Sequence, residues 1–254
     1  MTRDVLVITG VGGMGQAVAA RLGSGSQLLL ADFNEAILAE AAARLRGDGF
    51  DVHTQPVDVS KRASVHELAR RAASLGPVRR MVHTAGLSPV QASAAAILAV
   101  DLVGVAIALE EFGEVVEPGG AGVVIASMAG HMTMPIPPEQ EGMLARVPAE
   151  QLAELPFAQA SAFPDGGVAY GFAKRANALR VRAASVAWGA RGARINSISP
   201  GIIATPMGMA ELASASGGAM RAMISGSATK RVGTASDIAA AVEFAPIAVR
   251  IDLK

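Results

Sequence analysis

Tyr170 and Lys174 are the residues of this chain whose types and spacing most clearly suggest chemistry. Tyr170 is the only tyrosine, and it stands four residues before Lys174 in Tyr-Gly-Phe-Ala-Lys. On a helix these positions share one face, so the lysine ammonium would lie beside the phenol and favour its ionised form. A phenol, with a reference pKa of about 10, needs such a neighbour to exchange protons near neutral pH. Because many solvated helix faces carry the same spacing, the pair indicates a catalytic role only when other features of the sequence support it.

A glycine-rich turn is one such feature. Gly10, Gly12 and Gly15 directly follow an apolar run and open a helical segment, an order that holds a pyrophosphate at a helix N-terminus. Asp32 ends the next apolar run, where a carboxylate would bind ribose hydroxyls. The pattern predicts a dinucleotide site, although a tight turn beside a capping acid is the simpler alternative and methyltransferases share such loops. NAD is favoured over NADP, because Asp32 would repel a 2'-phosphate and no Arg or Lys stands in the loop or directly after Asp32.

Strands and helices alternate along the chain and would position these residues. Short unbroken apolar runs indicate strands that are buried on both faces, at Val5–Ile8, Leu28–Ala31, Met81–Val82, Val123–Ala126 and Ile195–Ile198. Ala-rich segments with helical spacing separate them, at Gln16–Leu22, Glu35–Arg46, Ser64–Leu75, Ala94–Val116 and Val168–Trp188. For the third helix we expect an N-cap at Ser60 and a stop at Gly76-Pro77. The alternation predicts one α/β domain over 1–254, a three-layer doubly wound parallel sheet of Rossmann-like type with ligands at the carboxyl ends of its strands.

Composition narrows the class of protein. The chain has 254 residues, no cysteine, and 22 basic against 22 acidic residues. We therefore expect no disulfide, no thiolate site and no nucleic-acid partner. No apolar run reaches the length of about 20 residues that spans a bilayer, and no signal peptide is apparent, so we expect a cytoplasmic protein without a membrane partner. His53, His66 and His83 lack metal-ligand spacing, and no metal is predicted.

Two segments interrupt the alternation. Residues 131–167 are rich in Pro, Met and Glu, and residues 207–226 are rich in Met, Ala, Ser and Gly. We interpret the first as an insertion that covers substrate and the second as a mobile lid; two surface excursions are the alternative. His131 would line the site or belong to the surface.

Four motifs occur in one order that resembles the short-chain dehydrogenase/reductase family over nearly the whole chain. They are the glycine loop, Ser127 in Ser-Met-Ala-Gly, Tyr170 with Lys174, and Asn196-Ser-Ile-Ser-Pro-Gly201 followed by Thr205. The resemblance implies an NAD-dependent enzyme in which Tyr170 is the base for a secondary alcohol, Ser127 binds the same oxygen, and Lys174 assists Tyr170 and holds the ribose. The implied cofactor residues, besides Tyr170 and Lys174, are Gly10, Gly12, Gly13, Met14, Gly15, Asp32, Phe33, Asp58, Val59, Thr84, Ala85, Gly86, Pro200, Gly201, Ile203 and Thr205. Asp58 would face the adenine, or it would only start a helix. Pro200-Gly201 would contact the cofactor, or it would only turn the chain.

The chain departs from the family pattern at four places. The glycine loop is one residue shorter than usual, and Asn-Ala-Gly appears as Thr84-Ala-Gly86. Asp101 stands where the family carries the Asn of its catalytic tetrad; we expect it to accept from a relay water or to be a buried acid bonded to backbone. The tail at 245–254 is atypical, with Val249–Leu253 as a weak edge strand, which puts the usual homodimer or homotetramer in question.

The insertion resembles that of the bacterial 3α-hydroxysteroid dehydrogenase/carbonyl reductase branch, which also has a similar Ala187-Trp-Gly189. Its apolar residues would cover a bulky hydrophobic alcohol or ketone such as a hydroxysteroid, or form a small core of their own: Met132, Met134, Ile136, Met143, Leu144, Leu152, Leu155, Phe157 and Phe163. A 3-oxoacyl thioester or a small carbonyl compound is the alternative substrate. A catalytically impaired NAD-binding sensor or structural protein is the alternative function.

Overall fold

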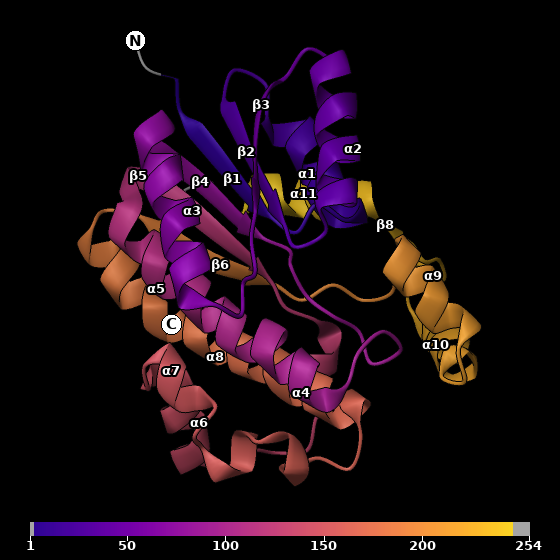
Figure 1. Cartoon of the computed structure of the whole chain (residues 1–254). Helices are drawn as coiled ribbons and strands as arrows, with labels where there is room; N and C mark the ends of the chain where they lie inside the picture. The colour runs from indigo at the N-terminus through magenta and orange to yellow at the C-terminus, as the bar shows by residue number, and fades with distance from the viewer. Residues whose placement is uncertain (1–2, 246–254) are drawn as a thin grey trace.

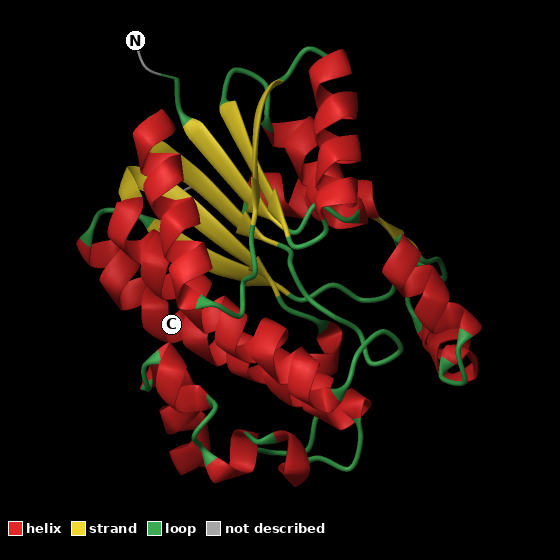
Figure 2. Cartoon of the chain, viewed as in Figure 1, coloured by secondary structure: helices red, strands yellow, loops and turns green. Residues whose placement is uncertain are grey.

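A sheet of six parallel strands runs through the centre of the molecule (Figure 2). The structure is a computed structural model, and it describes residues 3–245. The strands lie in the order β3-β2-β1-β4-β5-β6, with bounds β1 (Val5–Thr9), β2 (Gln27–Asp32), β3 (Asp51–Pro56), β4 (Val78–His83), β5 (Val116–Ile125) and β6 (Arg194–Ile198). The order reverses between β1 and β4, and such a switch point opens a ligand crevice at the carboxyl ends of the strands. The predicted single-domain, doubly wound α/β fold is confirmed.

Helices cover both faces of the sheet (Figure 1). One face carries α1 (Gly13–Leu22), α2 (Glu35–Gly47) and α11 (Ala235–Phe244), and the other carries α3 (Arg62–Leu75), α5 (Val105–Val115) and α8 (Gly166–Ala190). In β1, Leu6 and Ile8 pack on the first face while Val5 and Val7 pack on the second. Burial on both faces explains why the strands read as unbroken apolar runs.

Two local predictions at the sheet edge need correction. The predicted strands did not include β3, which has no apolar run. This edge strand buries only Val52, and its other residues are half-buried or exposed. The helix α3 starts at Arg62 with Lys61 as its N-cap, so Ser60 is not the cap. Instead the hydroxyl and the backbone N–H of Ser60 both donate to Asp58 Oδ1. The predicted stop of α3 at Gly76 is confirmed.

The segment predicted as one helix over Ala94–Val116 has three parts. A π-helical turn, η1 (Leu98–Gly104), joins α4 (Ala94–Ile97) to α5. A π turn widens the backbone by one residue and re-aims the side chains around it, and such turns are frequent at functional sites. Asp101 lies in the middle of η1 and is fully buried.

The insertion consists of short helices between β5 and α8: η2 (Met128–His131), α6 (Pro138–Arg146), α7 (Ala149–Leu152), η3 (Pro156–Ala158) and η4 (Ala160–Ala162). Leu144, Leu152 and Leu155 are buried in the same core cluster as α5 and α8, and Ile136, Met143, Phe157 and Phe163 pack against it. The rings of Phe157 and Phe163 contact Phe172 of α8, with centroids 6.5 Å and 4.9 Å away. These seven residues therefore extend the main core and do not form a separate small core of their own.

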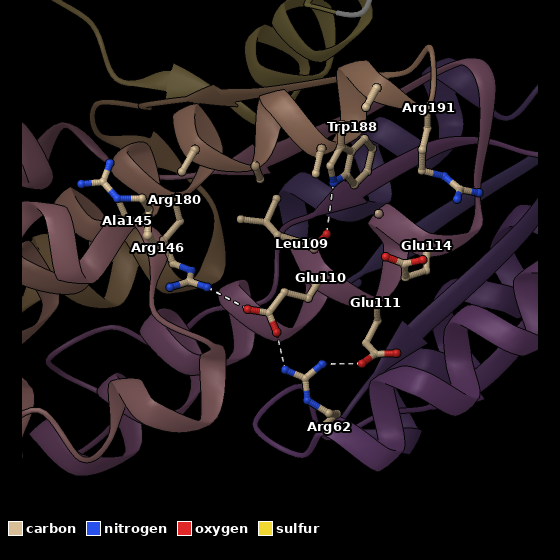
Figure 3. A pocket seen from close by; sticks show the side chains of 15 residues that line it. Arg62, Leu109, Glu110, Glu111, Glu114, Ala145, Arg146, Arg180, Trp188 and Arg191 are labelled. Carbon is tan, nitrogen blue, oxygen red and sulfur yellow. Dashed lines mark hydrogen bonds and ion pairs between the residues drawn. The ribbon is translucent and has the colours of Figure 1, made fainter.

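Paired charges fasten the insertion to the domain (Figure 3). Arg180 of α8 donates to the backbone oxygens of Leu144 and Val147 and to Glu110 of α5. Arg62 pairs with Glu110, Glu111 and Glu150. A cavity of about 680 Å³ opens above this network, between α5 and α8.

A second excursion leaves the body of the domain after β6. It contains β7 (Ile203–Ala204), α9 (Pro206–Ala213), α10 (Gly217–Gly226) and β8 (Gly233–Thr234), and β7 pairs with β8. The α9 and α10 pair projects to the right of the sheet in Figure 1. Of the tail predicted at 245–254, everything after Ala245 lies outside the described residues, including the possible strand at Val249–Leu253.

Trp188 offers a test of this packing. Its side chain is 1% exposed and its Nε1 donates to Leu109 O at 3.1 Å. Gly113 and Gly122 make room for the indole, since a Cβ at either position would lie 3.0 Å or less from it. We expect Trp188→Ala to lower the free energy of unfolding by about 3–5 kcal/mol. Urea denaturation followed by far-UV circular dichroism measures this without the lost fluorophore.

Val186→Ala on the same helix is the matched control. Its side chain is 76% exposed, so the change should stay within about 0.5 kcal/mol. A loss below about 1 kcal/mol for Trp188→Ala would contradict the packing.

Candidate active site at the carboxyl edge of the sheet

The glycine loop crosses the carboxyl ends of β1 and β4 in close contact with both. Gly10 has φ +85°, and a Cβ there would lie 2.5 Å from Ala85 N. A Cβ at Gly15 would lie 2.0 Å from Gly10 O. Thr84 Oγ1 donates to Gly10 O at 2.6 Å, so the hydroxyl that replaces the expected amide fixes the loop. The helix α1 starts at Gly13, and the free N–H groups of its first turn, which includes Met14 and Gly15, form an anion-binding cradle behind Gly12.

Asp32 is held against this loop. Its Oδ2 accepts from Val11 N at 2.7 Å and its Oδ1 accepts from Asn34 N at 2.8 Å. Phe33 beside it is 77% exposed. After β3, Asp58 accepts from Ser60, and Val59 is buried beneath Gly104, where a Cβ would meet Val59 at 3.0 Å. The structure therefore aligns these predicted residues along the edges of β1, β2 and β3.

A cavity of about 510 Å³ lies beside the loop and brings the two halves of the predicted site together. Ser127 and Tyr170 line it, as do predicted cofactor residues: Met14, Pro200, Gly201, Ile203 and Thr205. Most of its other lining residues are apolar, and Met132 and Met134 are the only ones of the nine apolar insertion residues among them. Gly12, Asp32, Asp58 and Thr84–Gly86 lie outside the cavity, toward β1, β2, β3 and β4.

Glycines allow the segment after Ser127 to pack closely on the helix that carries Tyr170. Ser127 follows β5 and caps η2, where its Oγ accepts from Ala129 N at 3.2 Å. A Cβ at Gly130 would lie 2.6 Å from the backbone of Lys174 and Arg175, and a Cβ at Gly171 would lie 2.7 Å from Thr133. The two glycines therefore let η2 and α8 approach closely, and Ser127 and Tyr170 both line the cavity.

Lys174 stands directly behind the phenol. Its Nζ lies 5.4 Å from the centre of the Tyr170 ring and 3.5 Å from Ile125 O, and its side chain is 5% exposed. Asp101 Oδ1 lies 2.8 Å from Nζ. Burial lowers the pKa of Lys174, but Asp101 and Tyr170 together outweigh the effect of burial and leave the pKa raised. The ammonium therefore stays charged at neutral pH.

Asp101 contacts Lys174 directly, whereas a relay water was expected between them. Its Oδ2 accepts from Leu87 N at 2.9 Å. Burial raises the pKa of Asp101, while the charge of Lys174 and the Leu87 N–H oppose that rise. Gly86 makes room for the ion pair, since a Cβ there would lie 2.6 Å from Asp101 Oδ1 and 3.3 Å from Lys174 Nζ. Asp101 is thus a buried acid bonded to backbone, as the second expectation has it, and it also pairs with Lys174, while its part in a proton relay stays a prediction.

Sequence reasoning gave no role to His83, which is fully buried at the end of β4. Its Nδ1 lies 2.8 Å from Thr9 Oγ1. Burial, with the nearby charge of Lys174, lowers the pKa of His83 to about 3, so the imidazole is neutral. A histidine that ends a buried strand next to the glycine loop is the signal that could have identified it.

Other predicted contributors lie elsewhere. His131 is exposed, lies 3.0 Å from Ser199 Oγ through Nε2, and does not line the cavity. Within residues 3–245, no group of three or more His, Asp or Glu is placed to hold a metal ion. No helix in the described part of the chain combines the length and apolarity needed to cross a membrane.

Comparisons with known proteins agree with this geometry. The family model described as "short chain dehydrogenase" matches residues 4–138, and the one described as "Enoyl-(Acyl carrier protein) reductase" matches 155–245, so the unmatched stretch lies in the insertion. The short-chain dehydrogenase/reductase bsc3 of Alternaria brassicicola is 40% identical over 96% of this chain and 89% of its own length. Human estradiol 17-beta-dehydrogenase 11 is 37% identical over 34% of this chain and 30% of its own length. The crystal structure of gox2181 superposes with a TM-score of 0.75 at 22% identity, over 97% of this chain and 89% of that one.

The ion pair predicts the effect of Asp101→Asn. Without the carboxylate, the buried ammonium of Lys174 loses its counter-charge, so the protein should lose about 3 kcal/mol of stability at neutral pH. In the wild type, the raised pKa of Lys174 keeps the lysine charged, so the stability that the ion pair supplies is retained up to the pH at which a free lysine loses its proton. In the variant the pKa of Lys174 falls instead, so the variant gains stability relative to wild type as the pH rises toward about 10. Urea unfolding of both proteins at several pH values measures their free energies of unfolding, and the difference between them should become smaller as the pH rises.

Glu114→Gln, an exposed change of the same charge on α5, is the control and should leave stability within about 0.5 kcal/mol at each pH. A stability difference for Asp101→Asn that does not change with pH would contradict the electrostatic account.

Proposed function

The chain belongs to the short-chain dehydrogenase/reductase family and is an oxidoreductase, and from that premise we propose that it interconverts a secondary alcohol and a ketone by hydride transfer with NAD. The observation that carries the proposal is the shared cavity: Tyr170 and Ser127 line it beside the glycine loop, with the paired Lys174 behind the phenol. Family membership over both halves of the chain removes the methyltransferase alternative.

The residues at the carboxyl edge fit a dinucleotide. Gly12 leaves open space beside the loop, since a Cβ there would meet nothing within 4 Å, and the first turn of α1 offers N–H groups to a pyrophosphate. Asp32 would bind the adenine ribose, with Phe33, Asp58 and Val59 around the adenine. Residues Pro200 to Thr205 would hold the nicotinamide end. When bound, the dinucleotide supplies or accepts the hydride at its nicotinamide ring.

The side chains of the cavity handle the proton. In the oxidation, Tyr170 takes the proton of the substrate hydroxyl as its carbinol C–H bond breaks. Ser127 Oγ donates a hydrogen bond to the same oxygen and steadies its developing charge. Asp101 keeps the ammonium of Lys174 in place as a positive charge 5.4 Å from the centre of the Tyr170 ring, and Lys174 would also hold the ribose hydroxyls. The reduction runs these steps in reverse.

A bulky hydrophobic secondary alcohol, such as a hydroxysteroid, is the substrate class that we propose. A cavity of about 510 Å³ with walls of Met, Ile, Val and Pro suits an apolar molecule, and methionine adapts to irregular shapes. The partial similarity to an estradiol dehydrogenase points the same way. The insertion before Tyr170 supports kinship with the 3α-hydroxysteroid dehydrogenase/carbonyl reductase branch. We further propose a cytoplasmic homodimer or homotetramer, as the family resemblance implies.

A substrate panel tests the function. Hydroxysteroids, long-chain secondary alcohols and small polar alcohols are incubated with NAD or NADP, and nicotinamide reduction is followed by absorbance. We expect reduction of NAD with the bulky alcohols. Reduction only with small polar alcohols would reject the substrate class, and tight NAD binding without any reduction would favour a sensor or structural protein.

Tyr170→Phe tests the proton donor and acceptor. The variant keeps the ring but lacks the hydroxyl, so kcat should fall by about 10²–10⁴-fold. The dissociation constant for NAD, measured by titration calorimetry, should stay within about twofold, because all the other proposed cofactor residues are unchanged. A rate within about threefold of wild type would overturn the assignment of Tyr170.

Asp32→Asn tests the choice of cofactor. The amide oxygen can still accept a hydrogen bond from Val11 N or Asn34 N, while the negative charge is lost. We expect kcat/KM for NADP to rise by about tenfold relative to NAD, since one repulsion of about 1.4 kcal/mol disappears. Asp58→Asn serves as the comparison and should change that ratio less. An unchanged ratio in Asp32→Asn would show that Asp32 does not set the preference.

A further inference from the structure

Glu211 is a carboxylate in an otherwise apolar cavity. Apart from Tyr170, it is the only ionisable side chain among the described residues that line the site. The Met-rich segment 207–226 contributes it, together with Met207, Met220 and Met223. Apart from Glu211 and Tyr170, the polar side chains of the lining are hydroxyls of Ser and Thr.

The first turn of α9 fixes the position of Glu211. Thr205 caps this helix by accepting from Gly208 N at 3.1 Å, and Pro206 occupies the first position. A Cβ at Gly208 would lie 2.1 Å from Ile203 O, so the turn packs tightly on β7. Glu211 follows one turn later, on the same helix as Thr205, which we place beside the nicotinamide.

Glu211 forms no ion pair with a basic side chain among residues 3–245. The hydroxyl of Ser88, from the loop after β4, acts on its carboxylate. Ser88 is fully buried. Burial raises the pKa of Glu211, and the Ser88 hydroxyl only partly opposes the rise. A half-buried carboxylate without a strong donor is costly, and a ligand that brings a donor would relieve that cost.

We propose that Glu211 is a specificity-determining residue that accepts a hydrogen bond from a second polar group of the substrate. The substrate is then a bulky apolar secondary alcohol or ketone that carries, away from its reacting carbon, a hydrogen-bond donor. This inference deepens the proposed function and rests on it. A hydroxyl and an ammonium group both supply such a donor. Only binding of the ammonium group should depend on the negative charge of Glu211.

Matched probes test the inference on the full chain. The probes are a steroid diol, the same steroid without its second hydroxyl, and its analogue with an amine in that place. For wild type we expect kcat/KM to favour the two probes with a donor by about 10–100-fold over the probe without one, as hydrogen bonds to charged groups do. The same ratio is read from dissociation constants for the NAD-saturated protein, which does not need turnover.

Two substitutions separate charge from hydrogen bonding. Glu211→Leu should abolish the preference and improve binding of the probe that lacks the donor, because the cavity loses its carboxylate and gains an apolar side chain. Glu211→Gln keeps an acceptor oxygen, so it should retain the preference for the diol and lose that for the amine. Glu154→Gln, an exposed change outside the cavity, should leave all ratios unchanged. Thermal unfolding confirms that each variant is folded.

The outcomes distinguish the two proposals. Equal binding and turnover of the three probes by wild type, or a preference that survives in Glu211→Leu, would overturn the role of Glu211 while leaving the dehydrogenase function intact. Donor-dependent binding without nicotinamide reduction would uphold Glu211 and overturn the proposed function. Binding of none of the probes would reject both the substrate class and the inference.

Discussion

The buried ion pair between Lys174 and Asp101 is the interaction around which the site is arranged. An ammonium in this interior is tolerable only with a charge at contact distance, and Asp101 Oδ1 supplies one at 2.8 Å. The π turn η1 places Asp101 there, Gly86 leaves the space for it, and Leu87 N binds its second oxygen. Through this pair, a carboxylate holds the positive charge of Lys174 beside Tyr170, and that carboxylate stands where the family pattern has an amide.

The sheet edge joins that charge to the rest of the site. Gly10, Gly15 and Thr84 lock the glycine loop onto β4, and Gly130 and Gly171 lock η2 onto α8. These close backbone contacts leave little freedom in the relative positions of loop, hydroxyl and phenol. The helix α9 lines the cavity beside them, and its only charged contribution to the lining is Glu211.

Much of this could be predicted from the sequence, because strands buried on both faces and a glycine loop leave local patterns. The edge strand β3 left none, since only Val52 is buried. The π turn depends on tertiary packing, so an uninterrupted helix was the natural prediction for 94–116. The apolar residues of the insertion could not be assigned to the main core without the contacts made by Arg180 and Phe172. Glu211 was hidden for the same reason, because only the position of α9 places it in the cavity.

In the function that we propose, this chain moves a hydride between a carbinol carbon and a nicotinamide within its cavity. The most direct measurement uses an accepted hydroxysteroid that is deuterated at the reacting carbon, with mass spectrometry of the reduced dinucleotide. The account predicts that each reduced nicotinamide carries one deuterium and that none reaches the solvent. Reduced dinucleotide without the label, or label released to water, would contradict it.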